Sequence, residues 1–226
     1  MNILAFDCAD RLMSVALAAK DEVWYMEIDS ASRHSELLLE CAGMLCKTAE
    51  IRPGDLGLVS CMKGPGSFTG LRIGYSTAKG LALALGIPLA AVPTLDCLSR
   101  HLSIWPGIVI PAMDAKKGCF FAAIYRKGEK LTDYMDASPE NIAKEARSLM
   151  LSPEEPIVLT GGGADLLLPG LKALVSGNVE VDPSFGKGRA RELLEMSKGA
   201  ILNIVDEIDS GPLYIRKSDA ELSRIF

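Results

Sequence analysis

Short apolar runs and longer stretches of helical spacing alternate along the whole chain. In the first half this pattern predicts three strands, a helix, a strand, a helix, a strand and a short helix, at residues 2–6, 12–19, 22–28, 34–49, 57–62, 69–85, 88–92 and 94–102. Lys20-Asp21 lies between the second and third strands and predicts a tight hairpin turn. Ser32 or Ser35 is expected to cap the first helix, and Thr94 the short one.

The second half begins with the same pattern. It predicts three strands, a helix, a strand, a short helix after a triple glycine, a strand and a final helix, at residues 108–113, 119–125, 130–135, 139–150, 157–160, 164 onward, 178–181 and 189–205. Asp7 ends the first strand of the chain, and Asp114 ends the corresponding strand of the second half, 107 residues later. The same offset relates Lys20 to Lys127.

This repetition predicts an α/β fold that arose by internal duplication. We expect two lobes, residues 1–106 and 107–226, each a mixed sheet with flanking helices. Two unrelated hairpins would produce the same pattern by coincidence, and the sequence alone leaves that alternative open.

The composition is that of a globular protein with a sizeable core, since 49% of the 226 residues are hydrophobic and 23% are charged. The net charge of −5 argues against binding of nucleic acid by this chain unaided. The longest apolar run, 81–92, is broken by Gly86 and Pro88, so no membrane span is predicted, and the N-terminus reaches Asp7 without signal-peptide features. The six cysteines include no C-x-x-C pair, which is typical of a reducing compartment. We therefore expect a cytoplasmic protein.

An acid that ends a first strand, and recurs in a second lobe, resembles the actin-like superfamily of duplicated ATPase folds (ASKHA, ribonuclease H-like). In that superfamily a hydroxyl-bearing phosphate loop normally follows the acid. Here the following residues are Cys8-Ala9-Asp10, which offer no hydroxyl and add a negative charge. The pattern therefore favours a structural strand-end role for Asp7 over a catalytic one.

A glycine-rich segment at 64–70 joins a predicted strand to a predicted helix. Because helix N-termini present unpaired amides and a positive dipole end, the segment is a candidate anion or nucleotide loop. Its candidate residues are Gly64, Gly66, Ser67, Thr69 and Gly70. The spacing fits neither a Walker A loop nor a dinucleotide-binding fingerprint. A purely structural turn explains the glycines equally well.

The two long helices of the first half each carry two stripes of apolar or small residues, whereas a surface helix of one lobe needs only one. The extra stripe predicts contact with a partner protein, and full burial inside the lobe is the competing explanation. The candidate partner interface comprises His34, Leu38, Cys41, Leu45, Gly70, Gly74, Ala78 and Ala82.

No catalytic or metal-binding constellation emerges from the sequence. His34 and His101 are the only histidines, which excludes an H-E-x-x-H site. Ser67 lacks the G-x-S-x-G context of a nucleophile elbow. A serine hydrolase that pairs Ser67 with His34 is a disfavoured alternative.

Five segments carry a resemblance that spans nearly the whole chain: residues 3–7, 33–35, 64–74, 113–118 and 212–216. Together they resemble the TsaB (YeaZ) family of bacterial tRNA threonylcarbamoyladenosine biosynthesis proteins, also known as glycoprotease or peptidase M22 homologues. Two departures stand out. Cys8-Ala9 stands where the family usually has Thr-Ser. Lys116-Lys117 stands where arginines are common in the family, which keeps the positive charge but loses the planar guanidinium group.

The resemblance implies an actin-like fold and a non-catalytic partner of TsaD. TsaD transfers a threonylcarbamoyl group from threonylcarbamoyl-AMP to the adenine next to the anticodon of tRNAs that read codons starting with A. The resemblance further implies TsaE as an ATP-hydrolysing third component, a homodimer when the chain is alone, and tRNA contact only through the complex. Helices 34–49 and 69–85 would form the interface.

We expect no tightly bound cofactor, with ATP or ADP at the complex interface as the candidate ligand, and no catalytic or metal-binding residue in this chain. The alternative is an actin-like kinase or ATPase that acts alone through Asp7 and the glycine-rich loop.

Overall fold

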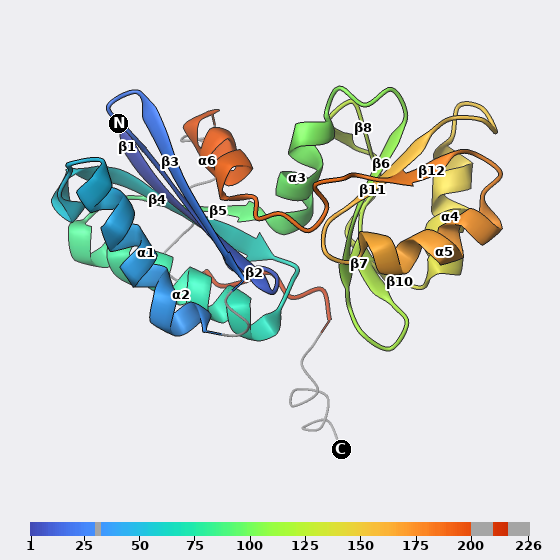
Figure 1. The fold of residues 1–226 in the computed structure, drawn as a ribbon. Helices are drawn as coiled ribbons and strands as arrows, with labels where there is room; N and C mark the ends of the chain where they lie inside the picture. Colours follow the sequence, from blue (N-terminus) through green and yellow to red (C-terminus); the bar gives the residue numbers. More distant parts are fainter. Residues whose placement is uncertain (30–32, 200–209, 217–226) are drawn as a thin grey trace, which may run out of the picture.

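Two lobes lie side by side in the computed structural model, which describes residues 1–29, 33–199 and 210–216 (Figure 1). The sheet of the first lobe has the strand order β3-β2-β1-β4-β5. Its strands are β1 (Asn2–Asp7), β2 (Leu12–Ala19), β3 (Glu22–Asp29), β4 (Leu56–Gly64) and β5 (Leu89–Pro93). β1, β2 and β3 are antiparallel neighbours, whereas β1, β4 and β5 run parallel.

Helices cover both faces of this sheet. Alternate residues of a strand point to opposite faces, so Leu4 and Phe6 of β1 pack in the core beneath α1 (His34–Thr48) and α2 (Phe68–Leu85). Ile3 and Ala5 pack on the other face, beneath α6 (Ala190–Gly199). Burial on both faces explains why β1 is apolar along its whole length rather than alternating.

The second lobe repeats the strand order, as β10-β7-β6-β11-β12. Its strands are β6 (Ile108–Asp114), β7 (Phe120–Ala122), β10 (Met135–Ala137), β11 (Ile157–Thr160) and β12 (Val179–Val181), with β8 (Tyr125–Arg126) and β9 (Glu129–Lys130) as a small hairpin beside β6. Ile142 of α4 (Pro139–Leu149) and Leu167 of α5 (Ala164–Leu174) pack on Ile110 of β6. The predicted α/β fold of two lobes with mixed sheets is confirmed.

Local geometry repeats along with the topology. At the end of β1, Oδ1 of Asp7 accepts a hydrogen bond from the main-chain N–H of Ala9 (3.1 Å), and at the end of β6, Oδ1 of Asp114 accepts one from the N–H of Lys116 (2.7 Å). Lys20 and Lys127 adopt nearly equal left-handed φ angles, 51° and 50°. Such φ angles are usual in two-residue hairpin turns, so the support for a duplication comes from the repeated strand order and the two strand-end acids.

The last helix crosses back to the first lobe. Leu193 and Leu194 of α6 share a core with Ile3 of β1, and Figure 1 shows α6 over the first sheet. In the other direction, α3 (Thr94–Ser99) follows the first lobe's last strand and packs against β6. The boundary between 106 and 107 stays a prediction, and α6, which follows it in sequence, packs on the sheet of the first lobe. The amphipathic pattern of a helix does not say which sheet it covers.

Several predicted boundaries change in detail. The predicted strands 119–125 and 130–135 are replaced by the shorter β7, β8, β9 and β10. A 3-10 turn at Pro53–Asp55 precedes β4, and another at Arg100–Leu102 follows α3. Thr94 does not cap α3, and its hydroxyl accepts the N–H of Gly64 instead (3.2 Å).

The predicted N-cap of the first helix is not found at Ser35, which lies inside α1; the helix begins after Arg33 without a side-chain cap. Ser32 and the end of the predicted helix 189–205 lie outside the described residues. No helix within the described ranges is both long and apolar enough to cross a membrane.

Candidate functional site

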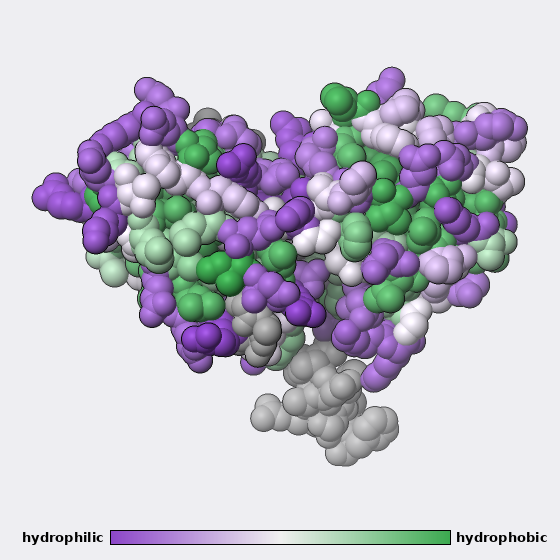
Figure 2. Space-filling model, viewed as in Figure 1, coloured by the Kyte–Doolittle hydropathy of each residue, from purple (hydrophilic) through white to green (hydrophobic). Residues whose placement is uncertain are grey.

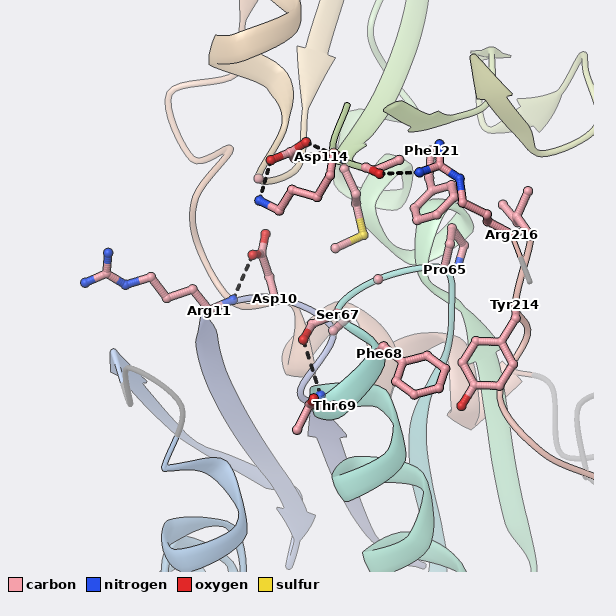
Figure 3. Close-up of a pocket in the computed structure, with 18 of the residues that line it drawn as sticks. Asp10, Arg11, Pro65, Ser67, Phe68, Thr69, Asp114, Phe121, Tyr214 and Arg216 are labelled. Carbon is pink, nitrogen blue, oxygen red and sulfur yellow. Dashed lines mark hydrogen bonds and ion pairs between the residues drawn. The ribbon is translucent and has the colours of Figure 1, made fainter. Parts of the chain in front are cut away.

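A cleft of about 1050 Å³ separates the lobes and contains most of the predicted loop (Figure 3). The residues after β1 and the start of α2 form one wall, and the β6–β7 turn forms the other. The last described residues also line it. Representative lining residues are Asp10, Ser67, Thr69, Asp114, Lys116 and Arg216.

The glycine-rich loop packs directly on the chain that follows β1. The N–H of Ser67 donates to the carbonyl oxygen of Ala9 (2.7 Å), and the Ser67 hydroxyl accepts the N–H of Gly70 (3.3 Å), which caps α2. A Cβ at Gly66 or Gly70 would collide with the carbonyl oxygens of Ala9 and Cys8. These contacts support the structural explanation of the glycines, because only glycine allows so close an approach.

Four of the five predicted loop residues line the cleft: Gly66, Ser67, Thr69 and Gly70. Gly64 is not among them. It is buried with φ of 114°, and the carbonyl oxygen of Leu213 lies where a Cβ would be. Anion binding at the start of α2 stays a prediction.

The opposite wall carries an ion pair that faces the loop. Nζ of Lys116 lies 2.6 Å from Oδ2 of Asp114, and this hydrogen bond holds the pKa of Asp114 below its ordinary value and raises the pKa of Lys116. Lys116 and Lys117 both have left-handed φ angles, 62° and 57°. The cleft therefore holds charges of both signs, with Asp10 and Arg11 on the first lobe.

Asp7 is buried and fully engaged by main-chain donors. Its Oδ1 accepts from Ala9, and its Oδ2 accepts the N–H of Arg189 at 2.8 Å. Burial raises its pKa from 3.8 to about 6, although these two hydrogen bonds act in the opposite direction. Asp7 also lines a second cavity of about 420 Å³, and its structural role stays a prediction.

The alternative serine hydrolase has no assembled pair at this site. The Ser67 hydroxyl serves as the cap of α2, and Nε2 of His34 lies 3.1 Å from the carbonyl oxygen of Asp10. Burial lowers the pKa of His34. Within residues 1–29, 33–199 and 210–216, no three His, Cys, Asp or Glu side chains are placed to hold a metal ion.

The predicted partner interface lies on the inner sides of the two helices and stays a prediction. All eight of its residues are buried within the monomer, and most pack between the helices α1 and α2 and their own sheet: His34, Leu38, Cys41, Leu45, Gly70, Gly74, Ala78 and Ala82. A stripe of small and apolar residues has the same appearance whether it faces a sheet or a partner, so the sequence did not separate the two.

The outer faces of the same helices mix apolar residues with charged ones such as Glu40 and Lys47, and Figure 2 shows hydrophobic and hydrophilic side chains intermingled on the first lobe. Leu39 and Met44 on α1 are 54% and 57% exposed, and Leu83 on α2 is 54% exposed. Two glycines, Gly43 and Gly80, lie on this exposed side with no atom within 4 Å of where a Cβ would be. We call the five residues Leu39, Gly43, Met44, Gly80 and Leu83 the outer helix face.

Sequence reasoning did not place the segment 213–216 at the cleft. Its residues were noted only as part of the family resemblance, yet Leu213, Tyr214 and Arg216 line the cavity. Their contacts are hydrogen bonds, a ring pair and an ion pair, which leave no periodic signal in a sequence.

Comparison with known proteins places the chain in a family. Residues 28–199 match the family model described as TsaD: tRNA N6-adenosine threonylcarbamoyltransferase. The chain belongs to the TsaD family. Within it, the chain is 28% identical to the tRNA threonylcarbamoyladenosine biosynthesis protein TsaB of Bacillus subtilis (strain 168) over 167 residues, which cover 74% of this chain and 73% of that protein. The predicted resemblance to TsaB (YeaZ) is thereby confirmed.

Solved structures agree on the fold of this TsaD-family member. YeaZ from Pseudomonas aeruginosa superposes with a TM-score of 0.77 at 23% identity, covering 95% of this chain and 99% of that one. A Bacteroides thetaiotaomicron protein with an actin-like ATPase fold has a TM-score of 0.50 at 11% identity, covering 86% and 95%. The predicted actin-like fold is confirmed.

Proposed function

We propose that this chain is a non-catalytic partner of TsaD in tRNA threonylcarbamoyladenosine biosynthesis. In this proposal TsaD transfers the threonylcarbamoyl group from threonylcarbamoyl-AMP to the adenine next to the anticodon of tRNAs that read codons starting with A. Membership of the TsaD family and the similarity to TsaB proteins support this role.

The site beside Asp7 supports a non-catalytic role. Both carboxylate oxygens of Asp7 already accept main-chain hydrogen bonds, and burial raises its pKa to about 6. The positions after it, Cys8 and Ala9, are covered by Gly66 and Gly70 of the loop. The loop side of these residues is therefore filled by packing, while Asp7 itself lines a second cavity of about 420 Å³ between the lobes.

The outer helix face is the observation that supports binding of a partner protein. Glycine inside a helix lowers helix stability by roughly 1 kcal/mol relative to alanine. Gly43 and Gly80 lie mid-helix on an exposed surface where nothing in the monomer requires them. Small residues flanked by Leu39 and Leu83 suit the close approach of another helix. We place TsaD there, and a second copy of this chain when TsaD is absent.

Further members of the assembly follow from the same proposal. We include TsaE as the ATP-hydrolysing component, contact with tRNA only through the complex, and a cytoplasmic location. ATP or ADP would bind at the complex interface, and no cofactor would be held tightly by this chain alone.

Co-purification with the TsaD of the same organism tests the proposal. Gly80→Arg should abolish capture, while the variant stays folded because no atom lies within 4 Å of its Cβ position and glycine is a poor helix former. Gly186→Arg is the matched control, an exposed glycine with equally open surroundings outside α1 and α2, and it should leave capture unchanged.

Two results would contradict the proposal. One is the absence of any complex between the unmodified chain and TsaD. The other is sustained ATP hydrolysis by the isolated chain, which would favour the alternative of an actin-like kinase or ATPase acting alone.

A further inference from the structure

We propose that residues 210–216 form a clamp that holds the two lobes at a fixed spacing. Figure 1 shows this segment crossing between the lobes on the side away from α3 and α6. Those two helices pack together in one core and connect the lobes, and the Asp10 side chain lies against Gly162 across the cleft. The molecule therefore has a hinge region on one side and the segment on the other.

The first half of the segment is bound to lobe one. The N–H of Leu213 donates to the carbonyl oxygen of Lys63 at the end of β4 (2.6 Å). The hydroxyls of Ser210 and Tyr75 are 2.7 Å apart, and Nζ of Lys79 donates to the Ser210 carbonyl (3.3 Å). These bonds anchor the segment to β4 and α2.

Tyr214 adds a side-chain contact to the same lobe. Its ring centroid lies 5.0 Å from that of Phe68, in the first turn of α2. The Arg72 guanidinium lies 3.8 Å from the Phe68 centroid, and its Nε donates to the Tyr214 hydroxyl (3.1 Å). Tyr214 is thus held by a ring and by a cation from one helix.

Among the described residues 210–216, the side chain of Arg216 carries the contact with lobe two. The Arg216 guanidinium binds both carboxylate oxygens of Asp136 on β10, each at 2.6 Å, and also donates to the carbonyl oxygen of Ala115 (2.7 Å). The bidentate fork gives this contact a defined direction. The Arg216 and Asp136 side chains are 30% and 21% exposed, so water can compete for the pair.

The two ends are therefore unequal. Lobe one holds the segment by main-chain, hydroxyl and ring contacts, whereas lobe two holds it through Arg216. The residues between also line the cleft. Release of Arg216 would free the lobes to move apart about the α3–α6 region and would widen the cleft.

Small-angle X-ray scattering and hydrogen exchange of the full chain test the clamp. Arg216→Ala and Asp136→Asn should each increase the radius of gyration, and the Leu213 amide should exchange about tenfold faster or more. Tyr214→Ala, at the other end, should increase the radius as well. Arg52→Ala is the control, because it removes a fork onto Asp55 that stays within lobe one.

An increased radius in the folded Arg216 and Asp136 variants, with or without faster exchange of Leu213, supports the clamp. An unchanged radius in both overturns it. Faster exchange at an unchanged radius also overturns it, since the segment would then be a surface tail without influence on the lobes. If Arg216→Ala fails to fold, the more conservative Asp136→Asn decides.

Discussion

The main-chain N–H of Arg189 donates a 2.8 Å hydrogen bond to Oδ2 of Asp7, across 182 positions of sequence. The next amide, of Ala190, donates to the hydroxyl of Ser14 (3.1 Å). The first N–H groups of α6 thus find acceptors on β1 and β2, the strands that the helix covers. A carboxylate at a helix N-terminus is also favoured by the helix dipole. Asp7 and Ser14 thereby fix where α6 returns to lobe one.

The burial of Asp7 predicts an unusual dependence of stability on pH. Its folded pKa of about 6 lies above the ordinary value of 3.8, so between these values the folded chain binds the proton more tightly than the unfolded chain. The contribution of Asp7 to the free energy of unfolding should therefore fall as pH rises from about 4 to about 6. The change is on the order of 3 kcal/mol.

Urea denaturation of Asp7→Asn at pH 4 and pH 7 checks this. The unmodified chain should gain stability relative to the variant on going from pH 7 to pH 4, because only it takes up the proton. Asp133→Asn, at an exposed position, controls for the removal of a charge. A difference between the unmodified chain and Asp7→Asn that is the same at both pH values would contradict the prediction.

A second prediction concerns the buried ion pair that Arg189, just before α6, forms with Asp182. The Arg189 guanidinium lies 3.1 Å from Oδ2 of Asp182 after β12, and the two side chains are only 5% and 6% exposed. Burial pushes the pKa of Asp182 up, but hydrogen bonds from Ser184, His101 and Thr160 outweigh it and leave the pKa below its ordinary value.

Asp182→Ala should therefore lower the free energy of unfolding by about 3 kcal/mol, because it removes one of the two carboxylates, Asp182 and Glu192, that pair with the buried Arg189 cation. Thermal or urea denaturation measures this loss. Arg52→Ala, which breaks an exposed pair, should leave the midpoint unchanged. Equal effects of the two substitutions would show that the buried Arg189–Asp182 pair contributes no more to the free energy of unfolding than an exposed pair does.

The sequence predicted those parts of the fold whose signal is local. Leu4 and Phe6 alternate with Ile3 and Ala5 in an apolar run, and such a run bounded by a turn is sufficient to predict a strand. The duplication was visible in the sequence because Asp7 and Asp114 occupy the same position, at the end of the first strand of each lobe. The return of α6 was not visible, since it depends on hydrogen bonds between residues far apart in sequence.

The candidate site was predicted in part for the same reason. The glycine-rich loop at 64–70 has a local signal, and most of it lines the cleft. The partner stripe was assigned to the buried side, because small residues occur on both sides of α2, as buried Ala78 and exposed Gly80 show. Exposed glycines such as Gly80, in the middle of a helix, were the available signal for the outer side.

A third prediction compares one substitution at two positions of α2. Gly70→Ala would drive a Cβ into the carbonyl oxygen of Cys8 and should destabilise the chain by about 1–3 kcal/mol. Gly80→Ala meets no atom within 4 Å and should stabilise it by up to roughly 1 kcal/mol, the helix-propensity difference between the two residues. Urea denaturation of both variants gives the comparison, and a shift of the same sign in both would contradict it.

The two sides of α2 give the last prediction. Ala78 is fully buried against the sheet, so Ala78→Arg would force a cation into the core and should lower the free energy of unfolding by at least about 3 kcal/mol. Leu83 is 54% exposed, and Leu83→Arg should change the free energy of unfolding by no more than about 0.5 kcal/mol.

Denaturation curves show which variants of α2 are folded, and capture by TsaD is then measured on the folded variant. Leu83→Arg should be stable and fail to bind, because the outer helix face meets the partner while the inner face meets the sheet. A stable Leu83→Arg that still binds TsaD fully would remove that face from the interface.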